Sequence, residues 1–192
     1  MSVHCLNRPL IGALLICAAL ASCGRTEAPP APAPAGPVPL ASVQELMQGQ
    51  VDPAADELWD AVSSEVTAKG DVDNRPADDA SWLKLRHRAL QVAEAANLLA
   101  LPGRVVVQPG KTLEDSHIKG ILNAADIQQR IKADPAQFAT HAKALQDSAW
   151  ELLGAIDKRD IAAYLAAGSH LDHACESCHR RYWYPNDQIP PG

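Results

Sequence analysis

The stretch that decides the fold is residues 159–183, which read RDIAAYLAAGSHLDHACESCHRRYW. Its apolar and small residues recur at intervals of three and four, which is the period of one helix face. These positions are Ile161, Tyr164, Leu165, Gly168, Leu171, Cys175, Cys178, His179 and Tyr182. We therefore expect one long amphipathic helix whose buried side also carries two cysteines and a histidine.

Three further stretches of the chain show the same helical period. The clearest buries Trp82, Leu85, Ala89, Val92, Ala96 and Leu99. Another begins at Asp134-Pro135, an N-cap with Pro at the first helical position, and buries Phe138, Ala142, Leu145, Ala149, Leu152 and Ile156. The first comprises Val43, Met47, Val51, Leu58, Trp59, Val62 and Val66, with a kink or restart at the N-cap pair Asp52-Pro53.

A long connection separates the second and third of these four helices. Leu101-Pro102-Gly103 ends the second helix, and a loop of about 15 residues then leads to a short helix over 124–132. Four amphipathic helices predict an all-α fold, an antiparallel four-helix bundle with one long crossover connection. The bundle covers residues 41–184, and residues 185–192 form a C-terminal tail.

The N-terminal part of the chain predicts export rather than folding into the bundle. Residues 1–22 have Arg8 followed by an apolar run too short to span a bilayer, which is typical of a signal peptide. The run ends Leu20-Ala21-Ser22-Cys23, which resembles a lipobox and predicts lipidation of Cys23. The alternative is an ordinary secretory signal with an incidental cysteine. Residues 23–40 are Pro- and Ala-rich and predict an extended tether.

The net charge limits the partners that the chain can bind. The formal net charge is −6, and removing Arg8 with the signal makes it −7. An acidic domain is a poor candidate for nucleic acid and is not attracted to anionic headgroups. We therefore expect membrane attachment through the lipid, no nucleic acid, and a partner protein with a basic docking face.

The remaining cysteines form the motif Cys175-Glu176-Ser177-Cys178-His179. This is the CxxCH pattern of covalent haem attachment. Positions i, i+3 and i+4 share one helical face, so both sulfurs and the imidazole can reach one haem. A redox CxxC, a zinc site and a buried structural pair are the alternatives, but there is no α/β context and no second cysteine pair. The motif predicts one covalent haem c, bound at Cys175, Cys178 and His179.

A CxxCH motif on the last helix of a four-helix bundle resembles the class II cytochromes c, the cytochrome c′ family, over residues 41–184. The resemblance implies that His179 is the proximal iron ligand and that a residue of the first helix faces the distal side. In low-spin members this residue is a methionine, and Met47 is the only methionine beyond the signal. The alternative for Met47 is a flexible core filler. The sequence departs from the family at Trp183, where members carry Arg or Lys.

Other residues compete for roles at the haem. His87, His141, His170 and His173 are alternative sixth ligands, although a solvated or hydrogen-bonded histidine is the commoner case. His117 and Arg104 lie in the long loop, where Arg104 could pair with a haem propionate. Because Arg180 and Arg181 replace the family's basic position, that position's roles cannot be carried over to this chain.

The function expected from these features is transfer of single electrons by a lipid-anchored, periplasm-facing cytochrome that is not an enzyme. The alternative is binding of nitric oxide or carbon monoxide, which needs an open sixth position. A peroxidase-like enzyme ranks last, because no distal His/Arg pair is apparent. Gly24 after the lipidated cysteine favours the outer membrane, and the resemblance implies dimerisation through the first two helices.

Overall fold

The computed structural model describes residues 36–68 and 70–185. The chain divides into two units, 1–35 and 36–192, and all described residues belong to the second. The predicted signal peptide, Cys23 and most of the tether therefore lie outside the described residues. The same holds for the C-terminal tail beyond residue 185, so the predicted segment boundaries stay predictions.

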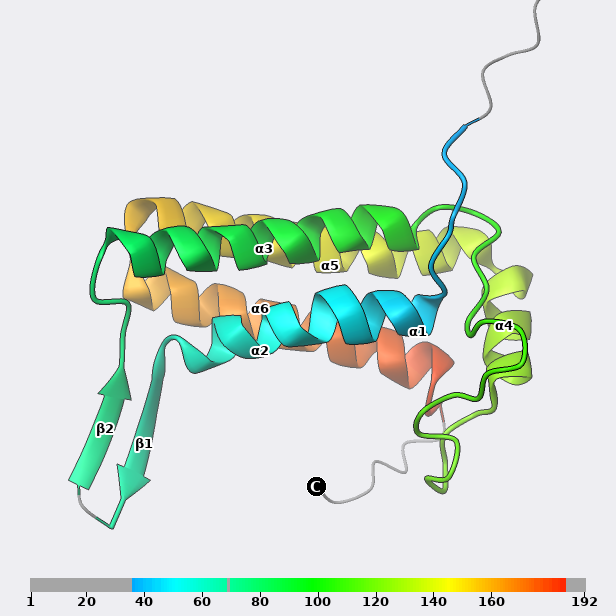
Figure 1. The fold of residues 1–192 in the computed structure, drawn as a ribbon, viewed down its shortest axis with the longest axis horizontal. Coiled ribbons are helices and arrows are strands. Elements are labelled where there is room, and N and C mark those ends of the chain that lie inside the picture. Colours follow the sequence, from blue (N-terminus) through cyan, green and yellow to red (C-terminus); the bar gives the residue numbers. More distant parts are fainter. Residues whose placement is uncertain (1–35, 69, 186–192) are drawn as a thin grey trace, which may run out of the picture. The chain divides into compact units, whose positions relative to one another are not determined.

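Long helices make up most of the second unit, and successive ones run antiparallel (Figure 1). This confirms the all-α four-helix bundle. The first helix is formed by three consecutive pieces, and the long connection between the second and third helices carries a short helix. The elements are α1 (Val43–Leu46), η1 (Met47–Val51), α2 (Asp52–Asp60), α3 (Asp79–Leu99), α4 (Ala124–Ala133), α5 (Pro135–Lys158) and α6 (Ile161–Tyr182).

The predicted stripes of α3 and α5 are buried at every position named above. In α6, Tyr164, Gly168, Leu171 and Tyr182 are buried, but Leu165 is 53% exposed and was wrongly placed in the stripe. Two contacts tie α6 to α2. The Tyr164 hydroxyl donates to the Leu58 carbonyl at 2.5 Å, and Trp59 Nε1 donates to the Gly168 carbonyl at 3.2 Å. The first and last helices are therefore neighbours in the bundle.

The helix starts are capped by polar side chains, as the sequence suggested for Asp134. Each capping side chain accepts a hydrogen bond from the backbone N–H three residues on, which satisfies a donor that the helix leaves unpaired. The caps are Ser42, Asp78, Asn123, Asp134 and Asp160. Ser42 forms a capping box with Glu45, whose carboxylate accepts from the Ser42 N–H at 2.7 Å.

The predicted kink or restart of the first helix at Asp52-Pro53 takes the form of a π-turn, η1, that ends at Val51, directly before α2 begins at Asp52. Asp52 has helical angles, φ −58° and ψ −51°, so it is not an N-cap. The backbone N–H of Asp52 instead donates to the Met47 carbonyl, a π-type bond that spans five residues. A proline inside a regular α-helix clashes with the carbonyl four residues before it. The wider π-turn over 47–51 accommodates Pro53, and the helix continues.

The first helix ends earlier than predicted, because an antiparallel hairpin follows it. Its strands are β1 (Ser63–Thr67) and β2 (Gly70–Asn74), paired from Ser63↔Asn74 to Thr67↔Gly70. Val62 and Val66 continued the helical spacing, so periodicity alone favoured a longer helix. The hairpin lies at the end of the bundle opposite α4 (Figure 1). No helix in the described part of the chain is long and apolar enough to cross a membrane.

Candidate functional site

A cavity of about 270 Å³ lies between the first helix, α5 and α6. The structure brings Met47, Cys175, Cys178 and His179 together in its lining. Most of the remaining wall is apolar, and it is contributed by Val43, Val51, Ala55, Trp59, Leu99, Phe138, Ala142, Leu145, Ala174 and Trp183. The motif on α6 therefore faces an apolar space rather than solvent.

The two cysteines are free thiols one helical turn apart on the cavity side of α6. Burial raises the pKa of both Cys175 and Cys178 to about 12. Both sulfurs are consequently protonated at neutral pH, because a thiolate would lose its hydration in this apolar wall. An S–H group can add across a vinyl carbon–carbon double bond, with sulfur bound to one carbon and the hydrogen to the other, and no oxidant is needed.

His179 is partly buried in the same wall, and its loss of hydration there lowers its pKa. The carboxylates of Asp52, Glu176 and Asp115 act in the opposite direction but do not outweigh burial. The imidazole is therefore neutral at pH 7 and has a lone pair available for a metal ion. The Trp183 ring covers it, with ring centroids 5.8 Å apart.

Met47 begins the π-turn of the first helix and is partly buried. It lines the main cavity and also an adjoining cavity of about 130 Å³. Asp52, His179 and Trp183 line both cavities as well. The predicted distal and proximal ligands therefore share two cavity walls, although they are 132 residues apart in the sequence.

The charged residues around the main cavity are acidic. Its lining includes Asp52, Asp56, Asp172 and Glu176 but, within the described residues, no lysine or arginine. Trp183, at the position that is basic in the family, contributes an indole ring instead. Arg180 does not reach the lining, because its Nε donates to Glu176 at 2.6 Å. Glu176 also accepts a hydrogen bond from the Tyr184 hydroxyl at 2.6 Å.

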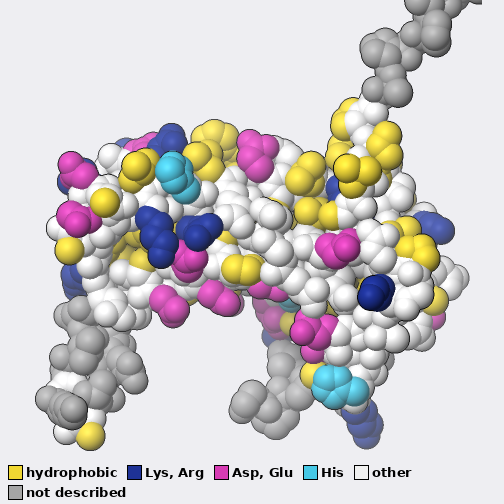
Figure 2. Space-filling view, viewed as in Figure 1, with side chains coloured by type: hydrophobic (Ala, Val, Ile, Leu, Met, Phe, Trp, Pro, Cys, Tyr) yellow, Lys and Arg dark blue, Asp and Glu magenta, His cyan; other side chains and the backbone are white. Residues whose placement is uncertain are grey.

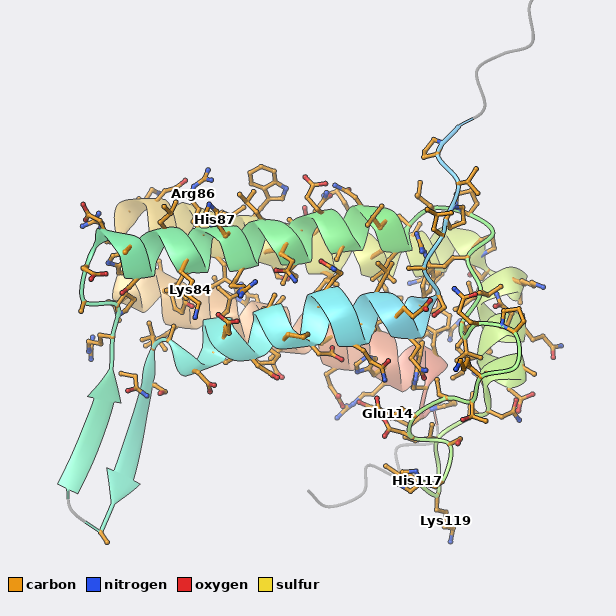
Figure 3. The ribbon with its side chains drawn as sticks, viewed as in Figure 1. Lys84, Arg86, His87, Glu114, His117 and Lys119 are labelled. Carbon is orange, nitrogen blue, oxygen red and sulfur yellow. The ribbon has the colours of Figure 1, made fainter. Side chains whose placement is uncertain are left out.

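Of the competing histidines, the structure brings His141 alone into the cavity lining. Burial lowers the pKa of His141, and its ring packs edge-on against Tyr182 at 5.7 Å between centroids. His87 lies on α3 beside Lys84 and Arg86, and His117 lies in the long connection (Figure 3). His170 pairs with Glu151 at 2.5 Å, and His173 is exposed.

Arg104 does not lie in the main cavity either. Its guanidinium is buried, at 6% exposure, and donates to the carbonyls of Leu98 and Ala41. Arg104 thus satisfies backbone groups at the end of α3 and before α1, and a role toward a propionate is not supported. This arginine is structural.

Two features of the site were missed in the sequence. Trp59 lines the main cavity, and the spacing of Met47, Val51, Ala55 and Trp59 by four residues could have revealed it. The segment 113–121 of the long connection lines the smaller cavity through Leu113, Glu114, Asp115 and Ile121. That segment has no regular structure, so no periodic signal in the sequence could have placed it.

The residues present fit a haem c. The walls are apolar, two protonated thiols and a neutral imidazole lie on one helix face, and a thioether shares the cavity. Residues 111–183 match the family model described as Cytochrome C′. No curated protein and no solved structure gives a significant match to the chain. The family implies a covalently bound haem c. The part of the chain that carries α5, α6 and the CxxCH motif is therefore similar to the class II cytochromes c, the cytochrome c′ family.

Proposed function

We propose that this protein is a single-haem electron carrier in which His179 and Met47 would both bind the haem iron. The observation that carries the proposal is that Met47 and His179 line the same two cavities. Met47 lies outside the residues that match the family, so this proposal depends on its position in the structure. When bound, the haem supplies a metal ion that cycles between two oxidation states.

The chain's own residues would hold, orient and shield that group. Cys175 and Cys178 supply the two thioether attachments, and Trp183 covers the proximal imidazole on one side. Leu145, Phe138 and the other apolar residues of the wall exclude water. Iron ligands held by helices that are packed on each other would need little rearrangement between oxidation states, which suits a carrier rather than an enzyme.

The absorption spectra of the purified holoprotein test this proposal. A six-coordinate, low-spin haem with the ferric methionine–iron charge-transfer band, and slow binding of carbon monoxide, is the expected result. A high-spin spectrum with rapid carbon monoxide binding would exclude Met47 as a ligand.

The second candidate is binding of nitric oxide or carbon monoxide. It is favoured by the apolar wall around Met47, formed by Val43, Val51 and Ala55, which would accept a small uncharged gas. The spectra that test the first proposal separate the two, because a gas-binding protein of this class needs an open or weakly occupied sixth position.

The partner that we propose is a redox protein with a basic docking face. Four carboxylates line the main cavity, and Figure 2 shows acidic side chains over α2. Attraction between exposed charges is screened by salt, so electron exchange with a basic partner should slow as ionic strength rises. A rate that is independent of salt would contradict this assignment. Pairing of two copies through the first two helices stays a prediction.

We also propose that the protein is anchored by lipid at Cys23 and faces the periplasm, with the outer membrane favoured by Gly24. Cys23→Ser should release the exported protein into the soluble periplasmic fraction, because acyl chains provide the membrane affinity. Fractionation of cells that produce the wild type and the variant measures this. If a correctly exported variant stays with the membrane, a protein partner is the anchor.

A further inference from the structure

We propose that Gln44 and Gln48 are positioning residues that hold Met47 at its cavity wall by binding residues 112–114 of the long connection. The inference rests on the proposed coordination of iron by Met47. It adds the residues that keep this ligand in place, which lie on both sides of Met47 in the first helix.

Gln44 binds the connection through both ends of its side-chain amide. Its Nε2 donates to the Thr112 carbonyl at 3.3 Å, and its Oε1 accepts from the Glu114 N–H at 2.9 Å. Leu113, between these two contacts, is buried at 5% exposure and lines the smaller cavity with Met47. Gln48 Nε2 donates to the Glu114 carboxylate. Residues 112–114 are thus bound by Gln44, one turn before Met47, and by Gln48, directly after it.

The helix is irregular where these contacts act. Met47 begins the π-turn, and its carbonyl accepts the five-residue hydrogen bond from Asp52. A π-turn is intrinsically less favourable than an α-helical turn and is common at functional sites. The hydrogen bonds from Gln44 and Gln48 to the connection therefore offset this cost, because they stabilise the turn that positions Met47.

The same connection is bound to the helix that carries His179. The Leu122 N–H donates to the Trp183 carbonyl at 2.8 Å, and the Trp183 ring packs on His179. Toward its start, the connection accepts backbone bonds from Val43 and Gln44, at the carbonyls of Val105 and Val106. The connection is thereby hydrogen-bonded to the first helix and to the end of α6, the two helices that carry the proposed iron ligands.

The experiment compares four holoproteins with covalent haem: the wild type, Gln44→Ala/Gln48→Ala, Met47→Ala and the control Gln146→Ala. Gln146 is a matched glutamine on α5 that donates to Asn97 on α3 and does not line the cavity. The measurements are the ferric methionine–iron band, the rate of carbon monoxide binding and the thermal midpoint. The loss of these three hydrogen bonds should shift the equilibrium toward released Met47 by roughly tenfold.

The inference is supported if the double variant weakens the methionine–iron band and binds carbon monoxide roughly tenfold faster, while Gln146→Ala keeps the wild-type values. A double variant that is less stable but spectrally unchanged overturns it, since the contacts are then structural only. If the wild type lacks the band and Met47→Ala changes nothing, the proposed coordination itself fails. These two failures are therefore distinguishable.

Discussion

The two helices that carry the proposed axial ligands are built in different ways. α6 is one uninterrupted helix, and regular spacing alone puts Cys175, Cys178 and His179 on one face. The first helix consists of α1, η1 and α2, and Met47 stands where the α-helix gives way to the π-turn. The residues that match the family model, 111–183, include α6 and exclude the first helix.

This difference separates two ways of holding a cofactor. On the α6 side, covalent bonds would fix the haem, so local helical geometry is sufficient. On the Met47 side, the ligand depends on tertiary contacts with the connection and with α3. The proximal site can therefore be read from local sequence, whereas the distal site depends on the assembled bundle. We expect mutations at the proximal site to abolish haem attachment completely, and mutations at the distal site to change iron coordination by degrees.

The largest expected effect is at the two cysteines of α6. Cys175→Ala combined with Cys178→Ala should abolish covalent haem, because no other cysteine in the described chain is available to form a thioether. Thioethers survive denaturation, so haem staining of a denaturing gel measures the result. A haem-positive band from the double variant would break the comparison by showing that attachment does not need this face of α6.

The next effect is at the distal side. Met47→Ala should convert a six-coordinate, low-spin haem into a largely five-coordinate or water-ligated one that binds carbon monoxide faster. The reduction potential should fall, because a thioether ligand favours ferrous iron. Absorption spectra and redox titration of the holoprotein measure these changes.

A Met47→Ala variant that stays low-spin would mean that another side chain supplies the sixth ligand. His141 is then the residue to change, since it is the one competing histidine that the structure brings to the cavity wall. His141→Leu alone should leave the spectrum unchanged if Met47 is the ligand. The pair of variants thus decides which helix supplies the distal side.

The regular parts of the fold could be predicted from sequence. The stripes that begin at Trp82 and Phe138 are buried as expected, and α5 begins at the predicted Asp134-Pro135. Helical periodicity is a local property, and a buried stripe is its direct consequence. The CxxCH residues share one cavity for the same reason, although their roles as haem ligands stay predictions.

Features that depend on non-local contacts were not predicted. The π-turn at Met47 is hydrogen-bonded through Gln48 to the long connection and through Gln50 to α3, whereas the sequence pattern favoured a new N-cap at Asp52. The hairpin that begins at Ser63 was taken as helix because Val62 and Val66 kept the helical spacing. The long connection reaches the site through hydrogen bonds that no periodic pattern encodes.

A smaller effect should distinguish α6 from the irregular first helix: the gain in stability when a glycine is replaced by alanine. Gly168→Ala in α6 should raise the free energy of unfolding by about 0.5–1 kcal/mol, because alanine costs less backbone entropy in a helix. The added Cβ would meet Trp59 at 3.7 Å, an ordinary contact. Gly49→Ala in the π-turn should gain less, because that turn lacks α-helical hydrogen bonding. Urea unfolding measures both, and equal gains would indicate that η1 behaves as ordinary helix.

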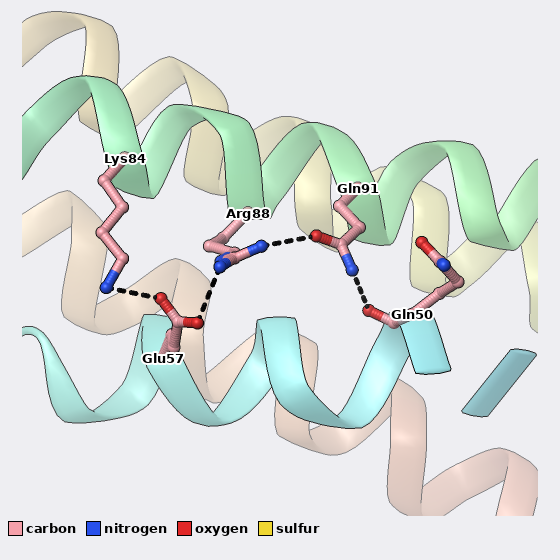
Figure 4. A network of polar contacts seen from close by, with 5 residues as sticks. All are labelled: Gln50, Glu57, Lys84, Arg88 and Gln91. Atoms are coloured by element: carbon pink, nitrogen blue, oxygen red, sulfur yellow. Dashed lines mark hydrogen bonds and ion pairs between the residues drawn. The ribbon is translucent and has the colours of Figure 1, made fainter. Parts of the chain in front are cut away.

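The smallest effect concerns the polar network that joins the first helix to α3 (Figure 4). Glu57 pairs with Lys84 at 2.8 Å and with Arg88 at 2.9 Å. Arg88 donates to Gln91, which donates to the carbonyl of Gln50 in the π-turn at 3.0 Å. The side chains of Glu57, Lys84 and Arg88 are about one third exposed or more, so solvent screens the ion pairs.

Glu57→Gln should therefore lower the free energy of unfolding at pH 7 by only about 0.5 kcal/mol. The hydrogen bond from Lys84, followed by that from Arg88, lowers the pKa of Glu57 in the folded state. A lowered folded pKa means that the stabilisation is fully present above the unfolded pKa and is lost as pH falls through the folded value. The difference between wild type and variant should thus vanish in acid. Asp157→Asn, which removes the Arg86 pair between α3 and α5, is the matched control away from the first helix. A Glu57→Gln deficit that persists in acid would show that packing rather than charge joins the first helix to α3.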